Sequence, residues 1–81
     1  MEKEQIIDRI KDIFIEHFED KTILITDQTT PDDIGLWDSL NHAVLINKIE
    51  SHFNIKFDFM DMMNFESVGD ICKGIEQKLT S

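Results

Sequence analysis

Several residue types and patterns are scarce in this sequence, and each absence excludes a class of protein. There is one cysteine, Cys72, so neither an intramolecular disulfide nor a metal site built from several cysteines can form. Only 8 residues are lysine or arginine against 17 aspartates and glutamates, and the net charge of -9 repels the phosphates of nucleic acids and anionic lipid. No apolar run approaches the roughly 20 residues that span a bilayer, and the charged N-terminus has no apolar signal core. We therefore expect a cytoplasmic protein that neither binds nucleic acid nor inserts into a membrane.

The hydrophobic residues that are present recur at helical spacing and indicate an all-α fold. Of the 81 residues, 41% are hydrophobic, which is enough for one globular domain over residues 1–81 with a modest core. There is no strand pattern, internal repeat or low-complexity segment. A first amphipathic helix is predicted over residues 3–18 by apolar residues at Ile6, Ile7, Ile10, Ile13, Phe14 and Phe18. A second helix is predicted over residues 39–53, with its core face at Leu45, Ile46, Ile49 and Phe53.

The C-terminal third of the chain predicts two more helices, the first of them short. Asp58 is a candidate N-cap for a helix that runs to about Phe65. The segment from Ser67 to Asp70 resembles a capping box, with aspartate in place of the usual glutamate, and opens the last helix. The inward face of that helix is predicted at Val68, Ile71, Cys72, Ile75 and Leu79. The expected fold class is therefore a four-helix bundle with a short third helix.

The connection between the first two helices, residues 19–38, is far longer than a usual link between helices. Its apolar residues are expected to cover the core: Ile23, Leu24, Ile25, Ile34, Leu36 and Trp37. Thr30 followed by Pro31 is typical of a cap and the first turn of a helix. Lys21 is the only cation in the connection, and crowding on folding is expected to raise the pKa of its carboxylates on balance: Glu19, Asp20, Asp27, Asp32 and Asp33. A long loop in so small a domain is usually structured or functional, and this one leads directly to Ser39.

Few residues could carry catalysis or bind a metal. Ser39 and His42 lie three residues apart on one helix face and could touch, but no third group is in view to orient His42. A bundle of this size has little volume for a substrate cleft, so a serine hydrolase is disfavoured and no catalytic residue is predicted. His17 and His52 are interpreted as solvated residues near helix ends, and Cys72 as a small core residue. The loop carboxylates lack the glycine and the spacing of a calcium-binding loop, so no metal site is predicted.

Ser39 stands where the long loop turns into the second helix, and the residues around it leave two interpretations open. It could be a plain N-terminal serine, with Asp38 accepting the first amide protons of the helix. It could also be a modification site, because the free amides and partial positive charge of a helix N-terminus favour an added phosphate. A serine after an exposed loop can be reached by another enzyme's active site and needs no neighbouring base of its own.

The tripeptide Asp38-Ser39-Leu40, at the start of the second helix of a small acidic four-helix chain, resembles the motif of the acyl carrier protein family. The motif stands about halfway along the chain, after a long loop and ahead of "LNHAVLINKIESHF". The pattern continues with "IKF", a short third helix, and "SVGDICKGI", which is similar to the opening of the last helix in these proteins. The resemblance covers essentially the whole chain.

The resemblance implies a carrier and not an enzyme. In that family the serine receives a 4'-phosphopantetheine arm from coenzyme A, added by a phosphopantetheinyl transferase, and the thiol of the arm holds an acyl or aminoacyl group as a thioester. Ser39 corresponds to the modified residue, with Asp38 and Leu40 as its motif neighbours. The partner-facing surface corresponds to Leu40, Val44, Asn47 and Lys48. The implied partners are the transferase, a ligase that loads an acyl or aminoacyl group, and acyl-processing enzymes, and the carrier is expected to act as a monomer.

The second helix departs from the pattern of carriers in primary fatty acid synthesis. Those carriers usually follow the motif with an acidic residue and keep further acids on the outer face of this helix. Here Glu50 is the only acid between residues 39 and 53, and the outer stretch holds Asn41, His42, Val44, Asn47 and Lys48. Electrostatic docking onto basic enzyme surfaces is expected to be weaker or differently placed. This favours a specialised lipid, polyketide or surface-polymer pathway over housekeeping fatty acid synthesis.

Two alternatives to an acyl carrier remain open. A peptidyl or D-alanyl carrier uses the same chemistry with an aminoacyl cargo and has a similar motif. An unmodified helical adaptor would bind a basic partner through the acidic surface and an apolar strip from Leu40 to Val44.

A cluster of large apolar residues in the predicted third helix also has two interpretations. Met60, Met62 and Met63 could line a slot for an acyl cargo between the second and third helices, because methionine side chains are flexible. Together with Phe59 and Phe65, they could instead hold a short helix to the core. The two roles are compatible, because such a slot would be part of the core.

Overall fold

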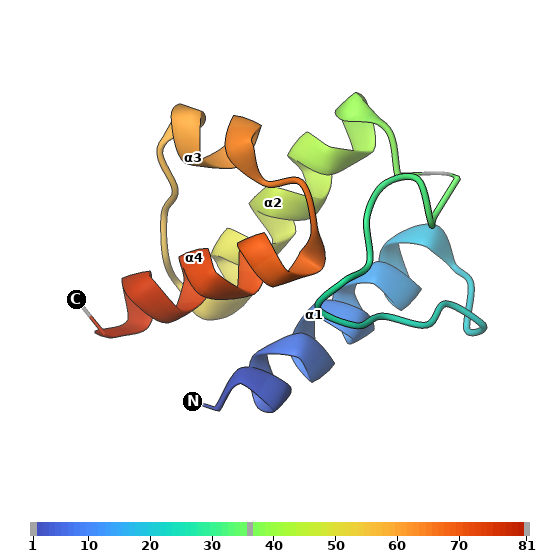
Figure 1. Ribbon diagram of the computed structural model, residues 1–81, viewed down its shortest axis with the longest axis horizontal. Coiled ribbons are helices and arrows are strands. Elements are labelled where there is room, and N and C mark those ends of the chain that lie inside the picture. Colours follow the sequence, from blue (N-terminus) through green and yellow to red (C-terminus); the bar gives the residue numbers. More distant parts are fainter. Residues whose placement is uncertain (1, 36, 81) are drawn as a thin grey trace.

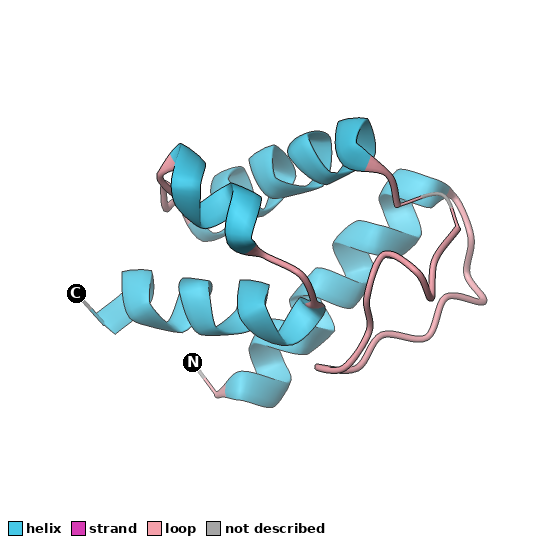
Figure 2. Cartoon of the chain, turned by 45° about the horizontal axis from the view of Figure 1, so that its top comes forward, coloured by secondary structure: helices cyan, strands magenta, loops and turns pink. Residues whose placement is uncertain are grey.

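Four α-helices make up the part of the chain that the computed structural model describes, residues 2–35 and 37–80 (Figure 1). They are α1 (Lys3–Phe18), α2 (Ser39–Phe53), α3 (Phe59–Asn64) and α4 (Val68–Thr80). No strand occurs in these residues. The predicted all-α bundle, its short third helix and the bounds of the first two helices are confirmed. In both views the long loop between α1 and α2 lies at the end of the bundle away from the C-terminus (Figure 1, Figure 2).

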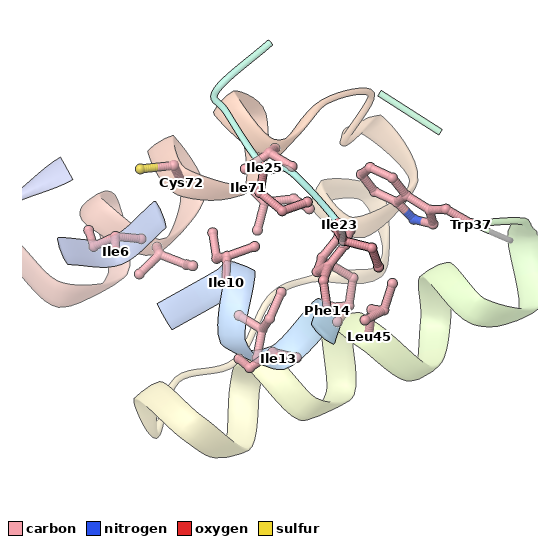
Figure 3. Close-up of a cluster of buried hydrophobic side chains, with 14 residues drawn as sticks. Ile6, Ile10, Ile13, Phe14, Ile23, Ile25, Trp37, Leu45, Ile71 and Cys72 are labelled. Atoms are coloured by element: carbon pink, nitrogen blue, oxygen red, sulfur yellow. The ribbon is translucent and has the colours of Figure 1, made fainter. Parts of the chain in front are cut away.

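The core is built from three helices and the loop, whose buried side chains meet in one cluster (Figure 3). The cluster contains Ile6, Ile10, Ile13, Phe14, Ile23, Ile25, Trp37, Leu45, Ile46, Ile49, Val68, Ile71, Cys72 and Ile75. The predicted inward faces of α1, α2 and α4 are confirmed for their members of this cluster, while Phe53 is only partly buried. Leu79 is exposed, so its predicted inward position is wrong. It belongs to the last turn of α4, beyond Ile75, the last buried residue of that helix, and close to the C-terminus (Figure 1).

The long loop, residues 19–38, is pinned to the start of α4 by two backbone hydrogen bonds. Val68 N donates to the Thr29 carbonyl at 2.9 Å, and Gly69 N donates to the Asp27 carbonyl at 2.8 Å. These bonds satisfy two of the amides that a helix N-terminus leaves free. A Cβ on Gly69 would lie 2.7 Å from the Asp27 carbonyl oxygen, so the close approach of loop and helix requires glycine.

The loop covers the core with fewer apolar residues than expected. The loop side chains packed in or against the core are Ile23, Ile25, Ile34 and Trp37. Leu24 is 81% exposed, so the expectation that it covers the core is wrong. The segment around it is neither helix nor turn, and in an extended chain neighbouring side chains point to opposite sides. Leu36 lies outside the described residues.

The predicted caps of α3 and α4 are correct in position, but their side-chain bonds differ from the prediction. Asp58 is the N-cap of α3, yet its side chain makes no capping hydrogen bond. Asp70 N donates to Ser67 Oγ at 3.3 Å, as a capping box requires. The Asp70 carboxylate, however, accepts from Glu66 N at 3.0 Å and not from Ser67. The box is therefore half formed, with its returning bond displaced by one residue.

The segment that begins at Thr30 and Pro31 forms a turn and not the first turn of a helix. Thr30 N donates to the Asp33 carboxylate at 3.0 Å, and Asp33 N donates to the Thr30 carbonyl at 2.9 Å. The Asp33 side chain is thus hydrogen-bonded to Thr30, the first residue of the turn. Such a local side-chain bond favours a turn over a continuing helix.

Two of the loop carboxylates have specific polar partners. Asp20 accepts hydrogen bonds from the backbone N–H and the hydroxyl of Thr22, and these bonds hold the pKa of Asp20 below its ordinary value. Asp27 forms an ion pair with Lys3, with 3.0 Å between Lys3 Nζ and Asp27 Oδ2, which raises the pKa of the lysine. The expectation that crowding raises carboxylate pKa values is therefore wrong for Asp20, because the hydrogen bonds from Thr22 outweigh desolvation in their effect on its pKa.

Candidate functional site

Ser39 is the first residue of α2 and lies exposed at the end of the long loop. The helix is capped by the residue before it, because the Asp38 carboxylate accepts from Asn41 N at 2.8 Å. His42 N donates to the Asp38 carbonyl, also at 2.8 Å, to begin the helix. Among the described residues, none is hydrogen-bonded to the Ser39 hydroxyl. The predicted cap at Asp38 is confirmed, and the Ser39 hydroxyl is left free on the surface.

The side chain of His42 is held by two residues, and neither is Ser39. Trp37 Nε1 donates to His42 Nδ1 at 3.1 Å, and the two rings are stacked with an interplanar angle of 25°. The other ring nitrogen, His42 Nε2, lies 3.0 Å from the carbonyl oxygen of Met62 in α3. Both nitrogens of the imidazole are thus engaged away from the serine. The Ser39–His42 pair therefore lacks the arrangement of a nucleophile and its base.

Sequence reasoning missed the bond between Trp37 and His42. Trp37 was expected only to cover the core, which it does, with 3% of its surface exposed and its ring edge-on to Phe14 at a centroid distance of 5.0 Å. The available signal was that a buried indole N–H usually finds a hydrogen-bond partner. That rule predicts a partner without naming it, because the partner depends on the path of the loop.

A groove of about 400 Å³ opens beside Ser39, between α2 and α3. It is lined by Pro31, Trp37, Asp38, Ser39, His42, Ala43, Met62, Met63 and Phe65. Of the three methionines predicted for a cargo slot, Met62 and Met63 line this groove and Met60 does not. Asp38 is the one carboxylate in this described lining, so the groove suits an uncharged, largely apolar group.

Most apolar side chains of α3 are exposed and do not hold the helix to the core. Phe59, Met60 and Met63 are between 61% and 69% exposed, and none of the residues in α3 is buried. The core interpretation is therefore wrong for these three residues. A helix of 6 residues has fewer than two turns, so few of its side chains face the bundle at once. Met62 faces inward, and Phe65, just after the helix, packs against the core as well.

The four residues predicted to face partner enzymes differ in their exposure and in the groove that they line. Leu40 is 75% exposed, directly after Ser39. Val44, Asn47 and Lys48 line a different groove, of about 500 Å³, between α2 and α1. Val44 is half-buried there, whereas Asn47 and Lys48 are exposed. The apolar strip expected from Leu40 to Val44 is therefore exposed at Leu40 and half-buried at Val44.

Glu50, the single acid of α2, is turned towards the chain that follows the helix. Its carboxylate accepts from Phe57 N at 2.7 Å. There is no acid in the first turn of α2. Glu50 is the only acid of α2, and its carboxylate is hydrogen-bonded, so the outer surface of this helix presents Lys48 and no unbonded acid.

His17 joins the end of α1 to the start of α2, although it was expected to be solvated. Its Nε2 lies 2.8 Å from Asn41 Oδ1, and its ring meets that of Phe18 edge-on at 4.9 Å. The residue is partly buried, so the solvated interpretation is wrong. His52 is exposed, as expected.

Cys72 is buried in the core, as predicted. Burial raises the pKa of its thiol to about 11, and Glu76, which accepts from Cys72 Sγ at 3.5 Å, adds to the rise. A thiol that stays protonated at neutral pH is a poor nucleophile. Cys72 is therefore a packing residue and not a reactive one.

Two further kinds of site are not found in residues 2–35 and 37–80. No three or more histidine, cysteine, aspartate or glutamate side chains are grouped there so that they could hold a metal ion. No helix in the same ranges is long and apolar enough to cross a membrane.

Known proteins share both the sequence and the fold of this chain. Residues 8–75 match the family described as phosphopantetheine attachment site. The chain is 35% identical over 78 residues to an acyl carrier protein of Thermotoga maritima, and the match covers 95% of each chain. Its fold is similar to the solution NMR structure of a holo acyl carrier protein from Geobacter metallireducens, with a TM-score of 0.84 and 36% identity over 91% of this chain and 85% of that one. An acyl carrier protein from Enterococcus faecalis shares the fold, with a TM-score of 0.74 at 24% identity over 96% of this chain and 99% of that one.

The chain belongs to the acyl carrier protein family, whose members have a phosphopantetheine attachment site. Such proteins carry intermediates and are not catalysts, and the prosthetic group is 4'-phosphopantetheine. When bound, the group supplies a thiol that holds an acyl chain as a thioester. The residues of this chain fit the group, because the Ser39 hydroxyl is exposed and free of the helix cap, and a groove for an uncharged chain lies beside it.

Proposed function

We propose that Ser39 carries the 4'-phosphopantetheine arm, with Asp38 and Leu40 as the neighbours that a transferase contacts. The observation that carries this proposal is the free, exposed hydroxyl at the start of α2, where Asp38 and not Ser39 caps the helix through Asn41 N. The partial positive charge and the remaining amides of that terminus stabilise a phosphodiester anion on the serine. Leu40, 75% exposed, offers an apolar contact to a transferase that docks on this turn.

The groove between α2 and α3 is the slot for the cargo in this proposal. Ala43 of α2 and Met62 and Met63 of α3 provide apolar walls next to Ser39. Methionine side chains adapt to chains of different shape. An aminoacyl cargo is disfavoured, because its ammonium would find only Asp38 as a carboxylate in the lining, and Asp38 already accepts a helix amide. An acyl cargo needs no such partner.

The outer surface of α2 favours a specialised pathway over primary fatty acid synthesis. Exposed Lys48, together with a Glu50 that accepts from Phe57 N, leaves this surface without a free acid. A basic surface on a partner enzyme gains less from such a helix than from an acidic one. We infer a cytoplasmic carrier of a lipid, polyketide or surface-polymer pathway, whose partners are the transferase, an acyl-loading ligase and acyl-processing enzymes.

Intact mass after incubation with coenzyme A and a promiscuous phosphopantetheinyl transferase tests the proposal. The wild-type chain gains the mass of one phosphopantetheine. Ser39→Ala gains none and keeps its helical circular dichroism, because Asp38 still caps α2. Ser51→Ala is the matched control, since Ser51 is an exposed serine on the same helix, and it gains the same mass as wild type.

Two results would contradict this assignment in different ways. A wild-type chain that stays unmodified with several transferases would overturn the carrier function and favour the unmodified adaptor. Modification of Ser39→Ala would keep the carrier function and move the arm to another hydroxyl.

A further inference from the structure

The side chains of Trp37 and His42 are bonded to each other across the segment 38–41, which contains Ser39. The indole N–H can only donate, so His42 Nδ1 is the acceptor and carries no proton. The neutral ring then has its proton on Nε2, which donates to the Met62 carbonyl, a group that can only accept. One tautomer of the neutral imidazole satisfies both bonds.

His42 links a firmly anchored part of the site to a loosely held one. Trp37 is buried against Phe14 of α1, with ring centroids 5.0 Å apart. By contrast, α3 has no buried residue, and the side chain of its N-cap, Asp58, makes no capping hydrogen bond. In the described chain, the bond from His42 Nε2 to the Met62 carbonyl is the hydrogen bond that ties α3 to α2. Trp37 and Met62 both line the groove, and His42 is hydrogen-bonded to each of them.

We propose that His42 is a positioning residue of the attachment site, which fixes the segment around Ser39 and the groove beside it while its imidazole is neutral. This inference rests on the proposed attachment at Ser39. A second proton on the ring goes to Nδ1, and that N–H then faces the N–H of Trp37 with no acceptor between them. The bond to Trp37 is lost, and the segment and the groove loosen. Loading of Ser39 slows with acidification, because fewer molecules hold the segment around Ser39 in one conformation.

Few other titratable groups lie around His42, and the experiment needs a control for those that also change charge in the same pH range. In the described lining of the groove, Asp38 is the other titratable side chain, and the loop and α3 contribute uncharged residues there. From α1, His17 is bonded to Asn41, next to His42 in the chain. Histidine is the side chain that ordinarily changes charge between about pH 5 and 8. The effect of His17 must therefore be separated from that of His42 by mutation.

Two variants of His42 separate hydrogen bonding from ring shape. His42→Gln offers an amide oxygen and an amide N–H that can replace both bonds, and it does not titrate; His42→Phe keeps a planar ring and loses both bonds. The kcat/KM for loading with coenzyme A is measured from about pH 8 to about pH 5.5. Each wild-type value is divided by that of His42→Gln, which removes the pH dependence of the transferase. Trp37 is the single tryptophan of the chain, so its fluorescence reports the bond directly.

At pH 8, His42→Gln should load at the wild-type rate, and His42→Phe should load at least about fivefold more slowly, because it loses both hydrogen bonds and one lost neutral hydrogen bond costs about fivefold. Relative to His42→Gln, wild type should lose about fivefold on acidification, with a parallel change in Trp37 emission. His17→Gln should keep both changes. The proposal is overturned if His42→Phe loads as fast as wild type, if wild type and His42→Gln share one pH profile, or if His17→Gln abolishes the pH dependence.

Failure of this inference can be told apart from failure of the attachment at Ser39. If neither wild type nor any variant is loaded, the attachment proposal fails. The pH dependence of Trp37 emission then still tests the positioning role of His42. A pH-dependent emission in wild type that is absent from His42→Gln supports the positioning role, and a flat wild-type emission refutes it. If His42→Phe does not fold by circular dichroism, the comparison of wild type with His42→Gln is the test.

Discussion

The Asp38 carboxylate lies 2.8 Å from Asn41 N, so the helix that begins at Ser39 is capped by the residue before the serine. Two adjacent residues therefore have separate tasks. Asp38 holds the first turn of α2, and Ser39 is left free to accept a group without any loss to the helix.

This separation predicts different stabilities for two neighbouring alanine variants. Asp38→Ala should lower the free energy of unfolding by about 1 kcal/mol, the usual cost of removing an N-cap side chain. Ser39→Ala should leave it nearly unchanged. Asp38→Asn, which keeps an acceptor oxygen, is the control and should retain most of the stability. Urea unfolding followed by circular dichroism measures all three, and equal losses at the two alanine positions would mean that Ser39 shares the cap.

Because the long loop is hydrogen-bonded to the start of α4, we expect an alanine substitution at Gly69 to lower stability strongly and one at Gly35 to change it little. Gly69→Ala should destabilise the chain by about 2 kcal/mol, because its Cβ would lie 2.7 Å from the Asp27 carbonyl oxygen and the loop would have to move. Gly35→Ala is the matched control, since nothing lies within 4 Å of its Cβ position and its φ is not positive. It should be neutral or stabilising by up to about 0.5 kcal/mol. A Gly69→Ala chain as stable as Gly35→Ala would contradict the close contact.

Cys72 should be unreactive in the folded chain. Its buried thiol, with a pKa raised to about 11, should not react with an aromatic disulfide reagent at pH 8 unless the chain is unfolded. A chain that carries the arm should show one reactive thiol, and Cys72→Ala should show the same count. Rapid reaction of the folded chain before loading would mean that the core opens at α4.

The raised pKa of the Cys72 thiol predicts how the free energy of unfolding changes in alkaline solution. Its pKa is raised from the ordinary 9.0 to about 11, so the folded chain holds this proton more tightly than the unfolded chain does. Stability should therefore fall as the pH rises from about 9 towards 11. The pKa of Lys3 is also raised, by its bond to Asp27, and its contribution is lost in the same direction. The difference between the stability profiles of wild type and Cys72→Ala isolates the thiol, and identical slopes would contradict its burial.

The outer surface of α2 predicts a gain of function with enzymes of primary fatty acid synthesis. Asn47→Glu adds an acid at an exposed position and should raise kcat/KM with those enzymes severalfold at low salt, roughly as one favourable docking charge does. The gain should shrink as salt screens the charge. Asn47→Gln is the neutral control. If the wild-type chain already serves these enzymes efficiently, the acids of the loop and α3 suffice for docking and the specialised pathway is wrong.

The helices and the motif could be predicted because their signals are local. Apolar spacing alone predicted residues 3–18 and 39–53, and these are the bounds of α1 and α2. The cap at Asp38 is equally local, because it joins residues three apart. Such contacts form wherever the helix forms, so one stretch of sequence contains the evidence for them.

Contacts between distant parts of the chain could not be predicted in this way. Lys3 pairs with Asp27, 24 residues away, and so removes one charge from the expected crowd. The bond from Trp37 to His42 depends on how the loop enters α2, and exposure of Met60 depends on which side of a very short helix meets the bundle. The hydrophobic pattern of the sequence alone does not say which distant residues meet or which side of α3 faces solvent. That information comes from packing, as the exposed Leu24 between two buried isoleucines also illustrates.

The central claim, that Ser39 carries the arm, is tested most directly by tandem mass spectrometry of the loaded chain after digestion with trypsin. Trypsin releases residues 22–48 as one fragment, in which Ser39 is the only serine. The predicted result is a phosphopantetheine group on this fragment, located at Ser39 by its fragment ions. A group on the fragment that holds Ser51 or on the one that holds Ser67, or no group on any fragment, would contradict the claim.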